Sequence, residues 1–278
     1  AKLVEIGNPF HRNNQMYEHW IDPNFYKIHI PYEIGIQEKR VSQEFIEEQK
    51  QLLSDYEFKV LYEAEFPTET EDSLFKYKDI QQAIRTITEP PEKPEKILGI
   101  DVARMGLDYS IYTYVYRYGS LFVVKDIKKF GKQTLTDTAG SILSFLREHE
   151  VNILKIDATG LGSGLFDMLN EHIKNEKLKT EVVDVIFSEK ADDPHNLNRK
   201  SDLYMNLAKL FSEHSIIIPK DNTLINQLSK IKFKLTSNGK IQIDDNQEKS
   251  PDESDSLAIA CYVTQKPKII LDTNFLKL

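Results

Sequence analysis

Two apolar stretches, each carrying an aspartate at its end, decide the fold of this chain: residues 96–103, KILGIDVA, and residues 153–159, ILKIDAT. Their apolar residues follow one another without the alternation of a half-exposed strand, which predicts strands that are buried on both faces. Buried strands of this kind belong to a sheet that is covered by helices on each side, so we expect an α/β fold.

The segments around these two stretches extend the pattern. Residues 110–118 and 121–130 are rich in β-branched and aromatic residues and flank a Gly119-Ser120 turn, which predicts an antiparallel hairpin. After this hairpin we expect a helix capped by Thr136 or Asp137, and later a helix over 165–174, a strand over 181–188 and a helix over 197–214. A second hairpin is expected, with strands at 231–236 and 240–244. The last expected element is a helix over 250–265 that is capped by Ser250 and has Pro251 in its first turn.

Three meandering strands followed by alternating helices and strands is the succession of the RNase H-like fold. In that fold the first and fourth strands are parallel neighbours. We therefore predict an α/β fold with an RNase H-like mixed sheet, in which three antiparallel strands and further parallel strands are flanked by helices, together with a smaller N-terminal segment.

The N-terminal part is separated from this sheet by a proline-rich stretch. Residues 26–30 could form a strand, and Ser42 is a good N-cap for a helix over 44–53. Pro90, Pro91 and Pro94 are poorly compatible with a helix or a central strand. The expected divisions are an N-terminal segment at 1–88, a linker at 89–95, the sheet domain at 96–266 and a tail at 267–278.

Composition limits the kind of protein. The chain has 278 residues, 40% hydrophobic residues and a net charge of −8, which is typical of a globular protein. No apolar run approaches the roughly 20 residues of a membrane span, and the start of the chain has neither an initiator Met nor the plan of a signal peptide, so we expect a cytoplasmic fragment of a longer protein. The single cysteine, Cys261, is expected to be a buried core residue.

The candidate chemistry lies in four aspartates. Asp101 and Asp157 end two strands that would lie about 4.8 Å apart if they are neighbours. Two buried carboxylates this close need a compensating positive charge, and a divalent metal ion would supply it. Asp252 and Asp255 lie one turn apart on the last helix and share a face, so three or four oxygen ligands could converge.

Oxygen ligands without a cysteine or histidine motif favour Mg²⁺ or Mn²⁺ over zinc. Each aspartate also has a structural interpretation. Asp101 or Asp157 alone could cap a turn, and Asp252 could be stabilised by the dipole at the start of its helix. Asp108 is a possible extra ligand or a turn residue.

The segments GIDVARMGLDYSIY, ILKIDATGLGSGLFDML and SPDESDSLAIA resemble, in order and separation, the three acidic segments of the nuclease domain of tailed-phage terminase large subunits. The resemblance covers residues 96–265. It implies a metal-dependent DNA endonuclease that cuts concatemeric double-stranded viral DNA during genome packaging, by a two-metal-ion hydrolysis with Mg²⁺ or Mn²⁺. The implied catalytic and metal residues are Asp101, Asp157, Asp252 and Asp255, with either member of the last pair as the main helix ligand.

The same resemblance extends to the N-terminal part, where EIGNPF and FKVLYEAEFPTETEDSLF are similar to the end of the ATPase domain of that family. Residues 1–88 would then be a remnant of that domain. No GxxxxGK[ST] phosphate loop is present in the chain, so we expect no ATPase activity. The family implies double-stranded DNA as a partner, the portal and the small terminase subunit as partners of the full-length protein, and the cytoplasm of an infected host cell as the location.

Several basic residues could hold DNA phosphates. The candidates are Lys190, Arg199, Lys200, Lys232 and Lys234. The hairpin lysines could equally be its solvated face, which also discourages pairing between molecules. The glycine-rich run at 160–164 is not GxGxxG, and we expect it to be a tight turn that holds Asp157.

Two other functions remain open at this point. A non-catalytic module of a DNA-packaging motor would carry the same fold. An ATPase of the actin and sugar-kinase type shares the same core, and GIDVARMG resembles its first phosphate loop, but the second glycine-rich hairpin of that class is missing. Metal-dependent cutting of DNA would distinguish the nuclease from both.

Overall fold

The structure is a computed structural model, and it describes residues 3–10, 15–53, 55–66, 72–87, 90–102, 110–130, 134–244 and 250–263. Asp108 and the predicted tail at 267–278 lie outside the described residues. No helix in the part of the chain that the structure describes is both long enough and apolar enough to cross a membrane.

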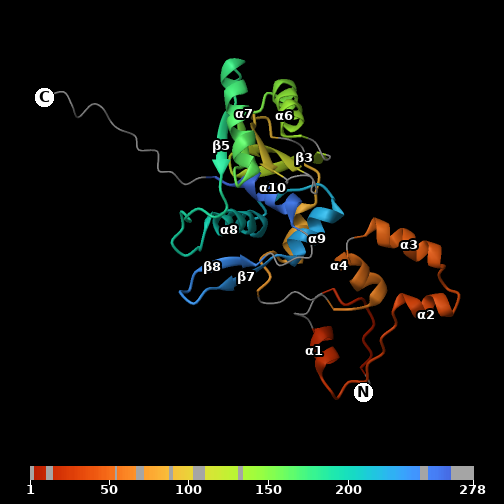
Figure 1. Ribbon diagram of the computed structural model, residues 1–278. Helices are drawn as coiled ribbons and strands as arrows, with labels where there is room; N and C mark the ends of the chain where they lie inside the picture. The colour runs from red at the N-terminus through yellow and green to blue at the C-terminus, as the bar shows by residue number, and fades with distance from the viewer. Residues whose placement is uncertain are drawn as a thin grey trace.

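The central feature is a six-stranded mixed sheet with the order β5-β4-β1-β2-β3-β6 (Figure 1). β1 pairs antiparallel with β2 and β2 with β3, whereas β1–β4, β4–β5 and β3–β6 are parallel. The bounds are β1 Glu95–Asp101, β2 Ser110–Tyr118, β3 Leu121–Phe130, β4 Ile153–Asp157, β5 Glu181–Val185 and β6 Ile216–Ile217. This arrangement confirms the predicted fold class.

Helices cover both faces of the sheet. α6 (Leu135–His149) and α7 (Leu161–Asn175) lie on one face, and α8 (Arg199–Ser212), α9 (Asn222–Lys230) and α10 (Asp252–Cys261) lie on the other (Figure 1). The predicted hairpin is present as β7 (Lys232–Leu235) and β8 (Ile241–Asp244). Two hydrophobic clusters, one on each face, hold the layers together.

Helix starts show where local patterns mislead. α6 begins a turn before the predicted caps, because Thr134 accepts a hydrogen bond from the backbone N–H of Asp137. α7 begins at Leu161, so the predicted glycine turn forms the first helical turn. In α10 the N-cap is Pro251 and not Ser250; the backbone N–H of Ser254 in the first turn donates to the side-chain oxygen of Gln227 at 2.9 Å.

Three elements that contribute to the sheet domain or pack against it were not predicted: α5 (Tyr77–Ala83), the short β6, and α9. α9 is capped by Asp221, whose side chain accepts from the backbone N–H of Leu224. α5 places Tyr77 and Ile80 in the same hydrophobic cluster as α8 and α10. α5 lies before the proline-rich stretch in the sequence but packs with helices of the sheet domain. The domain division between residues 88 and 89 stays a prediction.

The N-terminal part is mainly helical. Its elements are α1 (Gln15–Ile21), α2 (Tyr32–Gln37), α3 (Gln43–Leu52), α4 (Asp55–Phe58) and the π-helical turn η1 (Lys59–Glu63). Ser42 caps α3 as predicted, since its Oγ accepts from the backbone N–H of Phe45. The predicted strand at 26–30 is wrong, because this segment forms no ladder and its Tyr26, Ile28 and Ile30 are exposed.

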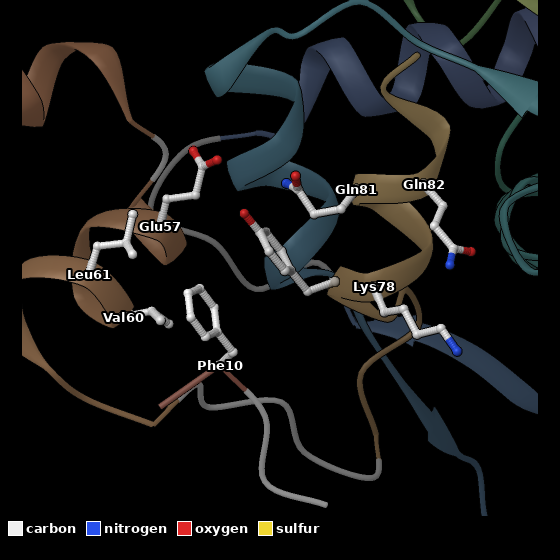
Figure 2. A pocket seen from close by; sticks show the side chains of 8 residues that line it. Phe10, Glu57, Val60, Leu61, Lys78, Gln81 and Gln82 are labelled. Atoms are coloured by element: carbon white, nitrogen blue, oxygen red, sulfur yellow. The ribbon is translucent and has the colours of Figure 1, made fainter. Parts of the chain in front are cut away.

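A cavity of about 360 Å³ lies between this part and α5. In Figure 2, Phe10, Val60 and Leu61 reach it from the N-terminal side, and Lys78 and Gln81 reach it from α5. None of the four predicted metal-binding aspartates lines this cavity.

Candidate metal centre

The parallel register of β1 and β4 brings two of the predicted aspartates to the same edge of the sheet. Gly99 pairs with Lys155 and Ile100 with Ile156, so Asp101 and Asp157 come next at the ends of neighbouring strands. Both aspartates are partly buried. The sequence pattern of two buried strands, each ending in an acid, therefore produces a pair of side chains at one place.

α10 brings the other two aspartates because it lies directly on β1. A Cβ added at Gly99 would be 2.5 Å from the backbone N of Ala260, so only glycine allows this approach. The Ser256 hydroxyl donates to the Gly99 carbonyl at 3.1 Å, and it also lies 2.8 Å from Oγ1 of Thr113 on β2. The first turn of α10, with its acids, thus reaches the end of β1.

Three further carboxylates act electrostatically on Asp101, and we call the four residues Asp101, Asp157, Asp252 and Asp255 the carboxylate cluster. Burial is the largest cause that raises the pKa of Asp101 well above its ordinary value, and the negative charges of the other three carboxylates raise it further. Lys200 opposes this shift with its positive charge. In the absence of a cation, the cluster therefore favours the protonated form of Asp101.

Protein donors orient two members of the cluster. Asp255 is 3% exposed; the Tyr204 hydroxyl donates to its Oδ1 at 2.6 Å, and Nζ of Lys200 lies 3.2 Å from the same oxygen. Asp157 accepts from the backbone N–H of Thr159 at 3.0 Å and from its hydroxyl at 2.6 Å.

The chain after Asp157 folds tightly around it. A Cβ on Gly162 would lie 1.7 Å from the backbone oxygen of Asp157, so the first turn of α7 can pack this closely only with glycine at that position. The glycine-rich run thus fits the predicted role of holding Asp157 in place, although it does so as helix and not as a free turn.

The donor chemistry of the cluster fits a hard divalent cation. It consists of carboxylate oxygens, the ligands that Mg²⁺ and Mn²⁺ prefer, and the cluster lacks thiol and imidazole groups. As the side chains stand, no three His, Cys, Asp or Glu residues among those described are grouped closely enough to ligate one ion. Oxygens of Asp157 and Asp255 accept the hydrogen bonds named above.

Two of the predicted DNA-binding residues lie inside the protein's own ion pairs. Arg199 has a side chain that is 15% exposed, and it binds Asp192 at 2.5 Å and Asp202 at 3.3 Å. Lys200 binds Asp255 within the cluster. For both residues the geometry favours a role within the fold over a contact with DNA phosphate.

The other three candidates lie nearer the surface. Lys190 is exposed in the loop before α8. In the hairpin, Lys232 pairs with Asp72 at 3.2 Å and Lys234 pairs with Asp244 at 3.5 Å. Their contact with DNA stays a prediction.

Sequence reasoning did not find Tyr204, Thr159 or Glu253. Glu253 is 3% exposed, forms an ion pair with Lys129 and accepts from Gln227, which ties the start of α10 to β3 and α9. The spacing of Lys200 and Tyr204, four residues apart on α8, could have shown that they share a helix face. Nothing local indicates that this face meets Asp255.

Comparison with solved structures identifies the fold. The large terminase nuclease of thermophilic phage G20c with bound magnesium matches with a TM-score of 0.51 and 17% identity, over 69% of this chain and 97% of the other. The nuclease domain of the large terminase subunit gp2 of bacterial virus Sf6 matches with a TM-score of 0.56 and 19% identity, over 69% and 99%. The chain has the fold of a large-terminase nuclease domain.

A third structure, a mutant of the Sf6 domain with manganese and beta-thujaplicinol, matches with a TM-score of 0.55 and 18% identity, over 69% of this chain and 99% of the other. No protein-family model and no curated protein matches the sequence. The likeness therefore establishes the fold. The chemistry has to be argued from the carboxylate cluster itself.

Proposed function

We propose that this chain is a divalent-metal-dependent endonuclease that cuts concatemeric double-stranded DNA during viral genome packaging. The observation that carries the proposal is the position of Asp101, which lies at the end of a buried strand with three other carboxylates close enough to raise its pKa. Such a concentration of negative charge opposes folding unless a cation is bound, and it is therefore unlike a set of structural caps. The fold shared with phage terminase nuclease domains, including one with bound magnesium, supports the same conclusion.

Each member of the cluster has a proposed role. Asp101 would be the ligand shared by two Mg²⁺ or Mn²⁺ ions, Asp157 would contribute a ligand from β4, and Asp255 or Asp252 would contribute one from α10. When bound, such ions lower the pKa of an attacking water and neutralise the charge that develops on the phosphodiester. The products would be a 5′-phosphate and a 3′-hydroxyl.

The surrounding residues prepare this site. Thr159 fixes one oxygen of Asp157, while Tyr204 and Lys200 hold Asp255. Because Lys200 binds the same carboxylate that a metal ion would use, it would exchange partners when the ion enters. Lys190, Lys232 and Lys234 are the proposed contacts to DNA phosphates.

The biological setting follows the same proposal. In a full-length protein the domain would act with a portal and a small terminase subunit in the cytoplasm of the infected host cell. Residues 1–88 would be the end of an ATPase domain, residues 89–95 a linker to the nuclease domain, and residues 267–278 a tail.

The test is cleavage of a supercoiled plasmid with Mg²⁺, Mn²⁺ or EDTA, without ATP. We expect the wild type to cut with metal and to stop with EDTA, and Asp157→Asn and Asp255→Asn to lose cutting while remaining folded. Asp167→Asn is the matched control, because Asp167 is an exposed aspartate on α7 outside the cluster. If the folded wild type is inert with every metal, the non-catalytic coupling module becomes the better interpretation.

A further inference from the structure

A buried lysine lies two residues before Asp157 in the sequence. Lys155 is on β4, and because side chains alternate along a strand it points to the same face as Asp157. It is 6% exposed. Its ammonium group donates to the backbone carbonyl of Ala260 at 2.9 Å and to that of Tyr262.

These carbonyls belong to the end of α10, where backbone acceptors have no partner within the helix. A cation at this end also interacts favourably with the helix dipole. The amide of Asn206 on α8 donates to the carbonyl of Cys261 at 3.0 Å. The C-terminal end of α10 is thus bound to β4 through Lys155 and to α8 through Asn206.

Burying an ammonium group at this position costs desolvation free energy. An apolar side chain of similar length would fill the volume without that desolvation, although it would leave the carbonyls of the helix without a donor. We therefore attribute the lysine at this position to the hydrogen bonds of its ammonium group, which join β4 to the end of α10.

That position is two residues before the strand-end aspartates. Lys155 pairs in register with Gly99, and α10 closely approaches the sheet at Gly99. Asp157 is two residues beyond Lys155 on the same strand face. α10 connects the clamped carbonyls to Asp255 through less than two turns of helix, so a slide or rotation of α10 would move Asp255 relative to Asp157.

We propose that Lys155 is a positioning residue that clamps the C-terminal end of α10 to β4 and thereby sets the separation between Asp157 and Asp255. This role rests on the proposed nuclease function, since Asp157 and Asp255 would both have to lie close enough to Asp101 to hold the metal ions with it. Misplacement of catalytic groups by about 1 Å can cost on the order of a hundredfold in rate.

The experiment compares Lys155→Met, which keeps the length and removes the donors, with Leu154→Ala. Leu154 is the matched control because it is a fully buried neighbour on the opposite face of β4, in the cluster beneath α6 and α7. Mn²⁺ binding is followed by the loss of the free-ion EPR signal, and cleavage is followed as kcat and as KM for DNA. All measurements are made on the full chain, at a temperature where each variant is folded by circular dichroism.

We expect Lys155→Met to weaken Mn²⁺ binding by about tenfold and to lower kcat by about a hundredfold, with KM for DNA within about twofold of wild type. Leu154→Ala should lose thermal stability but bind Mn²⁺ as the wild type does. If Lys155→Met does not fold, Asn206→Ala and Lys155→Arg take its place: each should weaken Mn²⁺ binding by a smaller factor than the full loss of the clamp.

The outcomes separate the two proposals. A wild type that binds Mn²⁺ and cuts DNA, together with folded clamp variants that do the same equally well, would overturn the role of Lys155 and leave the nuclease intact. A wild type that binds Mn²⁺ but does not cut would overturn the nuclease, while the Mn²⁺ affinities of the variants would still decide whether the clamp sets the site. A wild type that binds no Mn²⁺ would overturn both.

Discussion

The two ends of α10 contrast sharply. At its start, the negative charges of Asp252 and Asp255 help to raise the pKa of Asp101. At its end, residues 257–261 are fully buried, and the helix rests on Gly99 with its carbonyls bound by Lys155. One end therefore opposes folding and the other end supports it.

This difference teaches how a site of repelling carboxylates can be built into a stable domain. The apolar half of the helix packs into the larger of the two hydrophobic clusters, which extends from α5 to α10. Burial of these side chains is a favourable term that does not depend on metal. The fold therefore does not depend entirely on a bound cation, and the acidic half of α10 can remain in place before the cation binds.

The largest expected effect comes from removing the central charge. Asp101→Asn should reduce metal-dependent cleavage by about a thousandfold or more, which is about 4 kcal/mol in the barrier. The same change should raise the free energy of unfolding of the metal-free protein at pH 7 by about 1 kcal/mol, because one of four neighbouring negative charges is removed. Plasmid cleavage and thermal unfolding with EDTA check the two halves.

The sign of the pH dependence follows from the raised pKa of Asp101. An unfolded aspartate ionises near about pH 4, whereas the folded one keeps its proton to a higher pH, so the folded state binds more protons in this window. The stability of the metal-free wild type should therefore fall as the pH rises from about 4 through the raised pKa. Asp101→Asn should show a smaller fall, and an equal fall in both proteins would contradict the assignment.

The second effect concerns the supporting end. Gly99→Ala would place a methyl group 2.5 Å from the backbone of Ala260, and we expect a loss of about 2 to 4 kcal/mol in the free energy of unfolding, because α10 must move away from β1. Gly140→Ala is the matched control: a Cβ there meets nothing within 4 Å, and alanine in α6 should stabilise by about 0.5 to 1 kcal/mol. Chemical denaturation measures both. Equal effects at the two positions would show that α10 is not held closely by the sheet.

The third effect tests whether Lys200 and a metal ion compete for the same carboxylate. Lys200→Met removes the cation that binds Asp255, and we expect a loss of about 1 to 3 kcal/mol in the free energy of unfolding with EDTA. The deficit should shrink with Mn²⁺, because the ion replaces the missing charge. Melting curves with and without Mn²⁺ provide the measurement, and a deficit that is the same in both would place Lys200 outside the metal site.

The sequence predicted those parts of the site that depend on the residue pattern within a single segment. The strand-end positions of Asp101 and Asp157 follow from two buried strands, and their adjacency follows from the strand order that the whole pattern indicates. The acidic turn of α10 was recognised in the same way. Cys261 is also a buried core residue, as predicted.

The residues that sequence could not place act through partners that are distant in the chain. Lys200 was predicted as a phosphate contact, yet its partner Asp255 lies on another helix, 55 positions further along. Lys155 looks like a polar interruption in an apolar strand, and its partners are backbone carbonyls, which carry no sequence signal. The exposed Tyr26, Ile28 and Ile30 show the converse: strand-like alternation forms no strand without a neighbouring strand to pair with.

The smallest effects should come from the surface lysines, which lie outside both ends of α10. Lys190→Ala and Lys234→Ala should each weaken binding to duplex DNA by less than about tenfold and lower the slope of log affinity against log salt by about 1, because each removes one phosphate contact. Lys209→Ala is the control, since this exposed lysine on α8 pairs with Glu213 and is not a predicted contact. Fluorescence anisotropy in EDTA measures binding without cleavage. If the slope changes equally in all three variants, the loss reflects net charge alone, and the path of DNA across the domain has to be sought elsewhere.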